Sequence, residues 1–365
     1  MRIIDEVQLD FNDVLIQPKR STLNSRSEVE IEREFSWVDG NGTKRSFKCI
    51  PITAANMGTV GTIHCAEELV KHGYLSCLEK HIPADDIIAF FEKLTRQAIL
   101  ELKHDHEFYT SHIFLSVGAT ESLDTIQKVY DKFPYSDFKI NIDVPNGYTP
   151  HFMERVRECR AKFPGTFIVA GTVVTGDAVQ DLLMAGANCV RVGIGAGSVC
   201  ITRLKTGVGR PQLSTIIDCA DAAHQNNGFI MCDGGCNTAG DVCKALCAGA
   251  DFIMTGSLFA GTDEADGEVI EQNGKKYKQY YGMSSNYAQD HLFGGVKKYR
   301  TSEGRQVMVP YVGSIDDVVT DINGGIRSCC TYIGSRKIKH MSRQATFYKV
   351  NNQLNTKFAS METFK

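Results

Sequence analysis

A cysteine at the end of a glycine-rich segment is the strongest candidate for chemistry in this sequence. Three alternate glycines, Gly193, Gly195 and Gly197, interrupt an apolar run, and Cys200 follows them with Thr202 two residues further on. Glycine lets the backbone approach a bound molecule closely, and the thiolate form of cysteine is a nucleophile. The segment therefore predicts a site at which Cys200 attacks a ligand bound beside it. The alternative is that Cys200 is a buried packing residue.

The elements that would position this segment alternate along the chain. From about residue 50, short apolar runs alternate with helical patterns, which indicates parallel strands joined by helical crossovers. Eight such runs occur, the strand number of a closed (β/α)8 barrel, or TIM barrel. We predict a single catalytic domain over residues 1–365, with the segments before 50 and after 335 wrapping the barrel. The predicted strands cover residues 50–56, 74–79, 112–117, 138–143, 166–171, 189–194, 228–232 and 251–255.

Polar residues follow several of these predicted strands. In TIM barrels the active site lies at the carboxyl ends of the strands, and phosphate is often bound in the loops after strands 7 and 8. Those two loops offer glycine amides and the Ser257 hydroxyl for a phosphate, and the Asp233 carboxylate is suited to accept from ribose hydroxyls. The candidates at strand ends are Asn56, Lys80, Asp143, Asn146, Thr172, Cys200, Asp233 to Gly235, and Gly256 with Ser257.

An insertion over about residues 262–312 departs from the rhythm of the barrel. It contains an acidic stretch at 263–268, and glycine, hydroxyl and charged residues at 281–285 and 299–304. Long polar loops in compact domains are usually either functional or disordered. We interpret this insertion as a flap that covers the site.

The composition excludes some classes of partner. The chain has a formal net charge of -3 and a pI near 6.4, so no long-range field attracts polyanions. We therefore expect neither a nucleic-acid partner nor a membrane partner. The first residues lack the apolar core of a signal peptide, and no stretch is long enough to span a bilayer, so we expect a cytoplasmic protein.

The thirteen cysteines are expected to be reduced thiols, because no secretory signal precedes them. Cys232 and Cys236, and likewise Cys243 and Cys247, are separated by three residues, whereas zinc knuckles separate their cysteines by two. We therefore interpret these four as packing residues of helices and strands. The adjacent cysteines at 329–330 are interpreted as an ordinary pair of reduced thiols.

Nine short segments, taken in order, resemble those of a known family. They are residues 11–16, 18–23, 55–57, 146–148, 197–200, 205–209, 233–236, 281–285 and 299–304. Together they resemble the inosine monophosphate dehydrogenase and guanosine monophosphate reductase superfamily, and more closely its reductase branch. The resemblance covers nearly the whole chain.

Two features favour the reductase branch. The dehydrogenases usually carry a pair of regulatory modules inserted into the barrel, and this chain has no room for them. Their flap bears an Arg-Tyr pair that activates water, whereas the flap here has the reductase pattern Tyr-Arg-x-Ser-Glu-Gly, which includes Glu303.

The resemblance implies a reaction in which GMP is converted to IMP and ammonia with NADPH. Cys200 would attack C2 of the purine to give a covalent thioimidate, and the 2-amino group would leave as ammonia. Thr202 and Glu303 would handle the protons of the leaving amine. By resemblance alone, a potassium ion would be held at Gly195, Gly197 and Cys200, with Arg203 nearby.

The resemblance also assigns binding residues by position and implies a homotetramer. GMP would contact Asp233, Gly234, Gly235, Gly256, Ser257, Gly282, Met283, Ser284, Arg300, Thr301, Ser302, Glu303 and Gly304. NADPH would contact Ser25, Arg26, Lys80, Asp143, Val144, Pro145, Ile194, Gly195, Met283, Tyr299, Ser328, Cys329, Cys330 and Thr331. Ser25 and Arg26 would reach this cofactor from a neighbouring subunit.

Two positions depart from the reductase pattern at strand ends. Gly58 stands where the pattern has aspartate, and Thr172 stands where it has asparagine. These departures leave three alternatives open beside a GMP reductase. They are an enzyme similar to IMP dehydrogenase, a reductase for an altered purine nucleotide such as dGMP, and a weakly active nucleotide-binding protein.

Overall fold

The predicted barrel is confirmed, and its strands lie within about two residues of their predicted bounds. The computed structural model describes residues 3–101, 109–134, 137–292 and 301–351. Eight parallel strands close in the order β10-β11-β4-β5-β6-β7-β8-β9. They are β4 (Ile52–Ala54), β5 (Leu75–Leu78), β6 (Ile113–Val117), β7 (Lys139–Asp143), β8 (Ile168–Val173), β9 (Cys189–Val192), β10 (Phe229–Asp233) and β11 (Phe252–Thr255).

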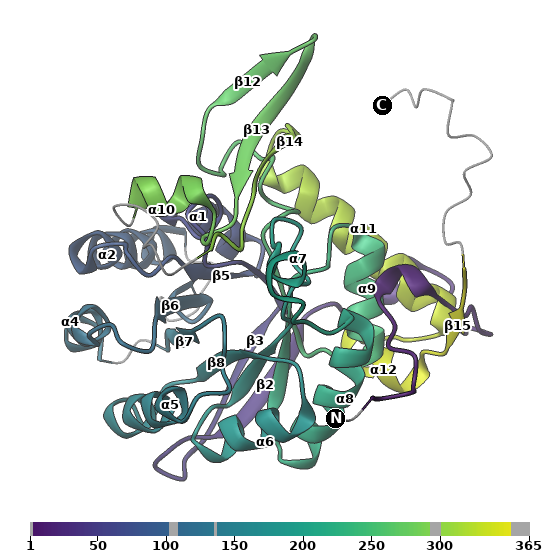
Figure 1. The fold of residues 1–365 in the computed structure, drawn as a ribbon, viewed down its shortest axis with the longest axis horizontal. Helices are drawn as coiled ribbons and strands as arrows, with labels where there is room; N and C mark the ends of the chain where they lie inside the picture. The colour runs from purple at the N-terminus through teal and green to yellow at the C-terminus, as the bar shows by residue number, and fades with distance from the viewer. Residues whose placement is uncertain (1–2, 102–108, 135–136, 293–300, 352–365) are drawn as a thin grey trace.

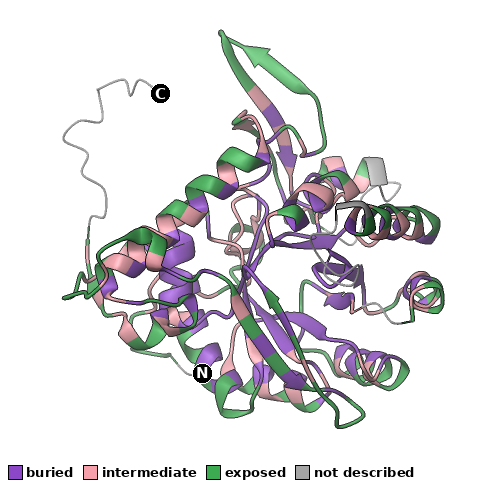
Figure 2. Ribbon diagram, turned by 180° about the vertical axis from the view of Figure 1, so that it is seen from behind, coloured by how far each residue is buried: buried purple, intermediate pink, exposed green. Residues whose placement is uncertain are grey.

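Helices surround the barrel and turn their apolar faces toward it (Figures 1 and 2). Side-chain caps fix where several of them begin, because Thr62, Thr149, Thr238 and Ser314 each accept a hydrogen bond from an N–H of the first turn. The helices that cover the barrel are α1 (Ile63–Lys71), α2 (Ala84–Glu101), α4 (Asp124–Lys132), α5 (Pro150–Lys162), α6 (Gly176–Met184), α8 (Gln212–Gln225), α9 (Ala239–Ala248) and α11 (Ile315–Ile333).

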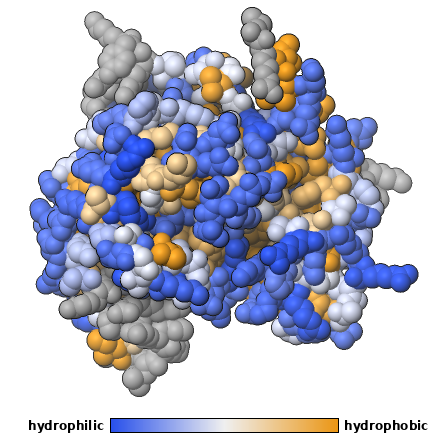
Figure 3. Space-filling view, turned by 90° about the horizontal axis from the view of Figure 1, so that it is seen from below, coloured by the Kyte–Doolittle hydropathy of each residue, from blue (hydrophilic) through white to orange (hydrophobic). Residues whose placement is uncertain are grey.

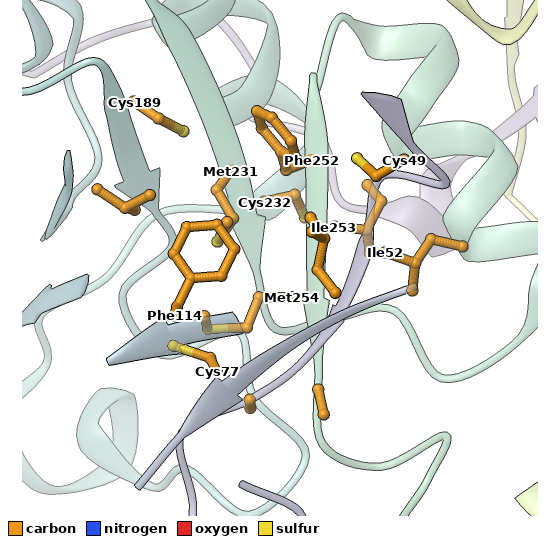
Figure 4. Packing of buried hydrophobic residues seen from close by; sticks show 14 of the residues in the cluster. Cys49, Ile52, Cys77, Phe114, Cys189, Met231, Cys232, Phe252, Ile253 and Met254 are labelled. Atoms are coloured by element: carbon orange, nitrogen blue, oxygen red, sulfur yellow. The ribbon is translucent and has the colours of Figure 1, made fainter. Parts of the chain in front are cut away.

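The barrel core is filled by apolar side chains and thiols. Figure 4 shows Ile52, Phe114, Met231 and Ile253 packed with the buried cysteines of neighbouring strands. All thirteen cysteines lie within the described residues, and all are free thiols, as predicted. Most of them are buried, so they stabilise the fold as small apolar side chains.

A hairpin from the N-terminal segment closes the barrel at the amino ends of its strands. Strands β2 (Arg33–Val38) and β3 (Lys44–Cys49) pair antiparallel. Phe35 of this hairpin stacks on Phe252 with 4.1 Å between ring centroids, and Trp37 packs edge-on against Phe167 at 5.1 Å. Strand β1 (Val14–Ile16) pairs with β15 (Phe347–Lys349), so the N-terminal and C-terminal segments contact each other, a pairing that the sequence did not predict.

A carboxylate is buried where the hairpin meets the barrel. Asp251 lies just before β11, its side chain is 2% exposed, and its Oδ1 is 2.7 Å from Nη2 of Arg33. Its Oδ2 lies 2.9 Å from Nε2 of His224 and accepts from the Ile230 amide at 3.0 Å. Burial raises the pKa of Asp251, but the contacts with His224 and Arg33 outweigh burial and lower that pKa. The hydrogen bond to Asp251 raises the pKa of His224.

The insertion after β11 forms a small sheet of its own. Strands β12 (Val269–Gln272), β13 (Lys275–Tyr281) and β14 (Gln306–Pro310) pair antiparallel, and α10 (Asn286–Leu292) lies between β13 and β14 in the chain. The tip of this sheet projects from the barrel and is exposed (Figures 1 and 2). Its base is anchored by Lys278, which is buried and donates to the carbonyl of Thr262 at 3.0 Å.

One face of the molecule carries mainly polar side chains. On the face in Figure 3, hydrophilic residues predominate and apolar ones are scattered among them. Among the residues that the structure describes, no helix combines the length and apolar character needed to cross a bilayer.

Candidate active site

The structure brings Cys200, Thr202 and Glu303 into one hydrogen-bonded chain. Cys200 lies in the loop between β9 and the short helix α7 (Thr202–Thr206). Its thiol donates to Oγ1 of Thr202 at 3.2 Å, and that hydroxyl donates to Oε2 of Glu303 at 2.7 Å. Both distances are those of ordinary hydrogen bonds for these atoms. The Cys200 sulfur is therefore connected through the Thr202 hydroxyl to a carboxylate that is 101 residues beyond Thr202 in the chain.

Backbone pairing holds the Glu303 segment of the insertion on the Cys200 loop. The amide of Ile201 donates to the carbonyl of Glu303 at 2.8 Å, and the amide of Arg305 donates to the carbonyl of Val199 at 2.9 Å. These two bonds form an isolated antiparallel bridge between Cys200 and Gly304. The segment that follows the described gap in the insertion thus pairs with the Cys200 loop as a short strand would.

Gly304 permits this close docking. A Cβ atom at residue 304 would lie 2.7 Å from the backbone nitrogen of Ser285, closer than side-chain atoms approach. The two arms of the flap also join here, since the Gly282 amide donates to the Arg305 carbonyl at 3.1 Å and the Ser302 hydroxyl donates to the Ser284 carbonyl at 2.9 Å. Residues 282–284 and 302–304, all predicted to contact substrate, are therefore neighbours.

A buried arginine connects polar side chains from four strand ends at the barrel mouth. Nη2 of Arg191, in β9, lies 2.8 Å from Oδ1 of Asp143 and 3.0 Å from Oδ2 of Asp233. The same guanidinium donates to Asn56 at 3.2 Å and to Thr172 at 3.2 Å. Four of the polar residues predicted at strand ends thus surround one cation.

Charge balance keeps Arg191 ionised in this position. Its side chain is only 7% exposed, whereas Asp143 and Asp233 are 26% and 24% exposed. Burial alone lowers the pKa of Arg191, but the two carboxylates outweigh burial and raise it. Part of each carboxylate therefore remains accessible at the mouth while Arg191 fixes its position.

The loops predicted to bind phosphate lie at the ends of β10 and β11. Gln212 is fully buried and donates to the carbonyls of Val192 at 2.9 Å and Asp233 at 3.2 Å, which ties the end of β9 to the end of β10. Gly234 and Gly235 have positive φ angles of 81° and 84°. Ser257, which follows Gly256, donates to Asn237 at 2.8 Å. These loops offer polar groups beside the Asp233 carboxylate.

The first group of predicted cofactor residues lies at the same mouth. Lys80 follows β5, and its Nζ lies 2.5 Å from Oε1 of Glu121. Asp143 ends β7, and its Oδ2 accepts from Nδ2 of Asn56 at 2.9 Å. Val144 is buried and pairs through its backbone with β8, and Pro145 is exposed. Ile194, Gly195 and Met283 are half-buried beside the Cys200 loop and the flap, and Met283 accepts from the Gly58 amide through its sulfur.

The second group of predicted cofactor residues lies elsewhere on the chain. Ser25 and Arg26 belong to the exposed turn η2 (Arg26–Glu28), where Ser25 caps the turn. This turn packs on α11, which carries the segment 328–331. Figure 1 shows α11 on the opposite side of the barrel from β6 and β7. Within one chain, the structure therefore brings residues 25–26 and 328–331 to one region and Lys80 and Asp143 to another.

The predicted potassium loop is braced by Arg203. Gly195 adopts a positive φ of 78°, and the Gly197 carbonyl accepts from the Cys200 amide at 3.0 Å. Arg203 donates from Nη2 to the carbonyl of Arg210 at 2.6 Å. This bond links the start of α7, just after the Cys200 loop, to the segment before α8. Carbonyl oxygens are suitable ligands for a potassium ion. Among the described residues, no group of three or more His, Cys, Asp or Glu side chains is arranged to hold a metal ion.

Two predicted residues, Tyr299 and Arg300, lie outside the described residues. Thr301 is described and is exposed at the start of the flap's second arm.

The two departures from the reductase pattern have different surroundings. Thr172 takes part in the network of Arg191 through its hydroxyl. At Gly58, a Cβ atom would lie 2.7 Å from the hydroxyl of Tyr281, so this tyrosine occupies the space beside the glycine. The hydroxyl of the neighbouring Tyr280 donates to the sulfur of Met57 at 3.4 Å.

Sequence reasoning missed two residues of the site. One is Arg191, and the available signal was an arginine inside a predicted buried strand, because buried charges need partners of opposite charge. Glu79, at the end of β5, accepts from the His81 amide at 2.9 Å, and burial raises the pKa of its carboxyl group. Its position at the carboxyl end of a strand was the available signal.

Known proteins match this chain over almost its whole length. Residues 8–356 match the family model described as IMP dehydrogenase / GMP reductase domain. The chain is 47% identical to GMP reductase 1 of Mus musculus over 358 residues, which is 98% of this chain and 99% of the relative. It is 45% identical to GMP reductase of Vibrio atlanticus over 362 residues, again 98% of this chain and 99% of the relative. The chain therefore belongs to the IMP dehydrogenase / GMP reductase family.

Proposed function

We propose that the protein converts GMP to IMP and ammonia with NADPH as reductant. The observation that carries the proposal is the chain of hydrogen bonds from the Cys200 thiol through Thr202 to the Glu303 carboxylate. Membership of the family and the names of relatives at 45–47% identity support the same reaction. A purine mononucleotide is accordingly the proposed substrate.

In the proposed mechanism Cys200 is the nucleophile. Its sulfur bonds to C2 of the purine, and the bond from C2 to the 2-amino nitrogen breaks, which gives a thioimidate and ammonia. The thiol proton passes through the Thr202 hydroxyl to Glu303, and Glu303 returns a proton to the leaving nitrogen. The intact relay is the reason to favour this enzyme over a nucleotide-binding protein without activity.

The nucleotide would lie between the strand ends and the flap. The Asp233 carboxylate, held by Arg191, is suited to accept from the ribose hydroxyls. The amides of Gly234, Gly235 and Gly256 and the Ser257 hydroxyl would bind the phosphate. The base would contact Gly282, Met283, Ser284 and the segment 300–304.

The residues at the mouth also fit a nicotinamide cofactor. Both oxygens of Asp143 are fixed, one by Arg191 and one by Asn56, so the carboxylate offers a rigid polar contact beside the Cys200 loop. Lys80 places a cation at the mouth, and Val144 provides a buried apolar side chain there. NADPH, when bound, would supply a hydride to C2 of the thioimidate. The bond between C2 and the Cys200 sulfur would then break, which gives IMP and frees the Cys200 thiolate. The residues Ser25, Arg26 and 328–331 would complete the site of a neighbouring subunit in a homotetramer.

Two finer assignments accompany the reaction. The carbonyls of Gly195, Gly197 and Cys200 would hold a potassium ion, with Arg203 bracing the loop through its bond to Arg210. The ion would stabilise the loop that presents Cys200. The thirteen free thiols suit a reducing compartment, so we assign the protein to the cytoplasm.

The test is NADPH oxidation with GMP, dGMP or IMP added separately, and with ammonia measured in parallel. We expect oxidation with GMP and one ammonia per NADPH. Oxidation with dGMP alone would indicate an altered nucleotide specificity, and NAD reduction with IMP would indicate a dehydrogenase. Binding without any turnover would contradict the proposal.

The covalent step is tested by Cys200→Ala. Removal of the nucleophile is expected to lower turnover by a factor of roughly 10^4 or more. The matched control is Cys159→Ala, a buried thiol on α5. If Cys200→Ala retains wild-type turnover, the thioimidate mechanism is wrong.

A further inference from the structure

Three thiols meet between α9 and α11, although the sequence does not group them. Cys243 and Cys247 lie one turn apart on α9, and Cys329 lies on α11. Helices α9 and α11 pack on each other, and the Cys329 thiol is close enough to those of Cys243 and Cys247 for each α9 thiol and Cys329 to shift one another's pKa. The sequence spacing had grouped these α9 cysteines with Cys232 and Cys236 instead.

Two small residues bring the helices together just before the thiols. A Cβ atom at Gly325 would lie 2.7 Å from the Cβ of Ala239, so the two backbones approach closely at this point. Cys329 follows Gly325 by one turn, and Cys243 follows Ala239 by one turn. The close approach of the helices therefore continues into the contact between the thiols.

The three thiols differ in their access to solvent. Cys243 and Cys247 are buried, with 3% and 4% of their surface exposed, whereas Cys329 is partly exposed. The two neighbouring α9 thiols lower the pKa of Cys329. The contact with Cys329, together with burial, raises the pKa of Cys243 and of Cys247. A solvent-accessible thiol with thiolate character is the kind that reacts with peroxides.

We propose that Cys329, Cys243 and Cys247 form an oxidisable site that reacts with hydroperoxides and closes a disulfide between α11 and α9. The Cys329 thiolate attacks one peroxide oxygen, the O–O bond breaks, and Cys329 becomes a sulfenic acid as water or alcohol leaves. The sulfur of Cys243 or Cys247 then attacks the Cys329 sulfur and displaces hydroxide, which takes the thiol proton and leaves as water. The two thiols are oxidised to one disulfide and the peroxide is reduced.

A second thiol pair provides a control inside the same molecule. The Cys232 thiol likewise raises the pKa of Cys236, so these two thiols are also close, but they are only 0% and 1% exposed. Because these two thiols contact each other but are not accessible to solvent, they should stay reduced when peroxide is added. Comparing the two groups therefore separates the effect of solvent access from the effect of proximity.

The experiment treats the full-length protein with equimolar hydrogen peroxide, blocks the remaining thiols by alkylation and maps disulfides by mass spectrometry without reduction. We expect a disulfide from Cys329 to Cys243 or Cys247, formed roughly tenfold or more faster than any disulfide between Cys232 and Cys236. A Cys329 thiol that stays reduced, or equal oxidation of both groups, would overturn the proposal. Disulfide mapping does not require turnover, so its result tests the thiol site whether or not the protein reduces GMP.

Variants on α9 identify the partner of Cys329. In Cys243→Ala the disulfide should form with Cys247, and in Cys247→Ala it should form with Cys243. The double variant should instead accumulate a Cys329 sulfenic acid, which dimedone traps. Unchanged NADPH turnover before peroxide treatment shows that the variants are folded. If the double variant traps no dimedone at Cys329, the first step of the proposal is wrong.

Discussion

Two buried charge networks lie at opposite ends of the barrel, and they are built with opposite charges at the centre. At the amino ends, the Asp251 carboxylate is surrounded by Arg33, His224 and the Ile230 amide. At the carboxyl ends, the Arg191 guanidinium is surrounded by the carboxylates of Asp143 and Asp233.

The difference lies in which groups keep access to solvent. Asp251 is 2% exposed and both of its oxygens have partners, so its carboxylate is not available to bind a ligand. At the other end the central cation is buried, and the outer carboxylates of Asp143 and Asp233 are about a quarter exposed. The first arrangement joins the hairpin to the barrel, whereas the second presents fixed oxygens to the mouth where TIM barrels place their chemistry.

The largest effect is expected for Arg191→Met. This change keeps much of the side-chain volume but removes the cation between two carboxylates, so we expect the free energy of unfolding to fall by about 3–5 kcal/mol. Turnover should be lost as well, because Asp143 and Asp233 would no longer be held. Urea denaturation and the NADPH assay measure the two effects. Arg191→Lys, which keeps the charge but not the fork of donors, should be intermediate.

A smaller and purely structural effect is expected for Asp251→Asn. Its partners Arg33 and His224 are 15% and 45% exposed, so water can solvate them, and we expect a loss of about 1–3 kcal/mol in the free energy of unfolding. Turnover per folded molecule should stay unchanged. A rise in KM for GMP would show that the two networks are not separate.

Asp233→Asn should act on binding more than on stability. The hydrogen bonds of a charged carboxylate to ribose contribute about 1.5–3 kcal/mol, so KM for GMP should rise roughly 10- to 100-fold. Steady-state kinetics measure this change. The control is Glu158→Gln on the outside of α5, where KM should not change. An unchanged KM in Asp233→Asn would remove this residue from the nucleotide site.

The smallest effect is a pH dependence from the network around Asp251. The pKa of His224 is raised in the folded state, so its stabilising contribution is complete below its unfolded pKa of about 6.5 and is lost as the pH rises through the folded value. His224 is 45% exposed, so the effect should be modest. Urea denaturation at several pH values should show a decline in wild-type stability that His224→Gln lacks. Identical profiles would contradict this assignment.

Much of the fold could be predicted because its signals are local. The eight strands were found from short apolar runs, and Cys200 was found from the glycines that precede it. The sequence showed that Gly58 departs from the reductase pattern. It did not show that the Tyr281 hydroxyl lies beside this glycine. The sequence also marked an insertion after the last barrel strand, but it did not predict the pairing of that insertion with the Cys200 loop.

The rest depended on contacts between distant residues. Sequence patterns grouped Cys243 and Cys247 with Cys232 and Cys236, whereas the packing of α9 on α11 brings them to Cys329. Arg191 could be recognised only after barrel closure placed Asn56, Asp143 and Asp233 around it.

The sequence by itself therefore determined the order of strands and helices, the candidate nucleophile and the family pattern of the site, because hydrophobic periodicity and turn residues act over a few neighbouring positions. Only the tertiary structure decided which charges face Arg191, that Glu303 reaches Thr202, and which cysteines share a contact. These are matters of distance between segments far apart in the chain. Closing the barrel and docking the flap set those distances.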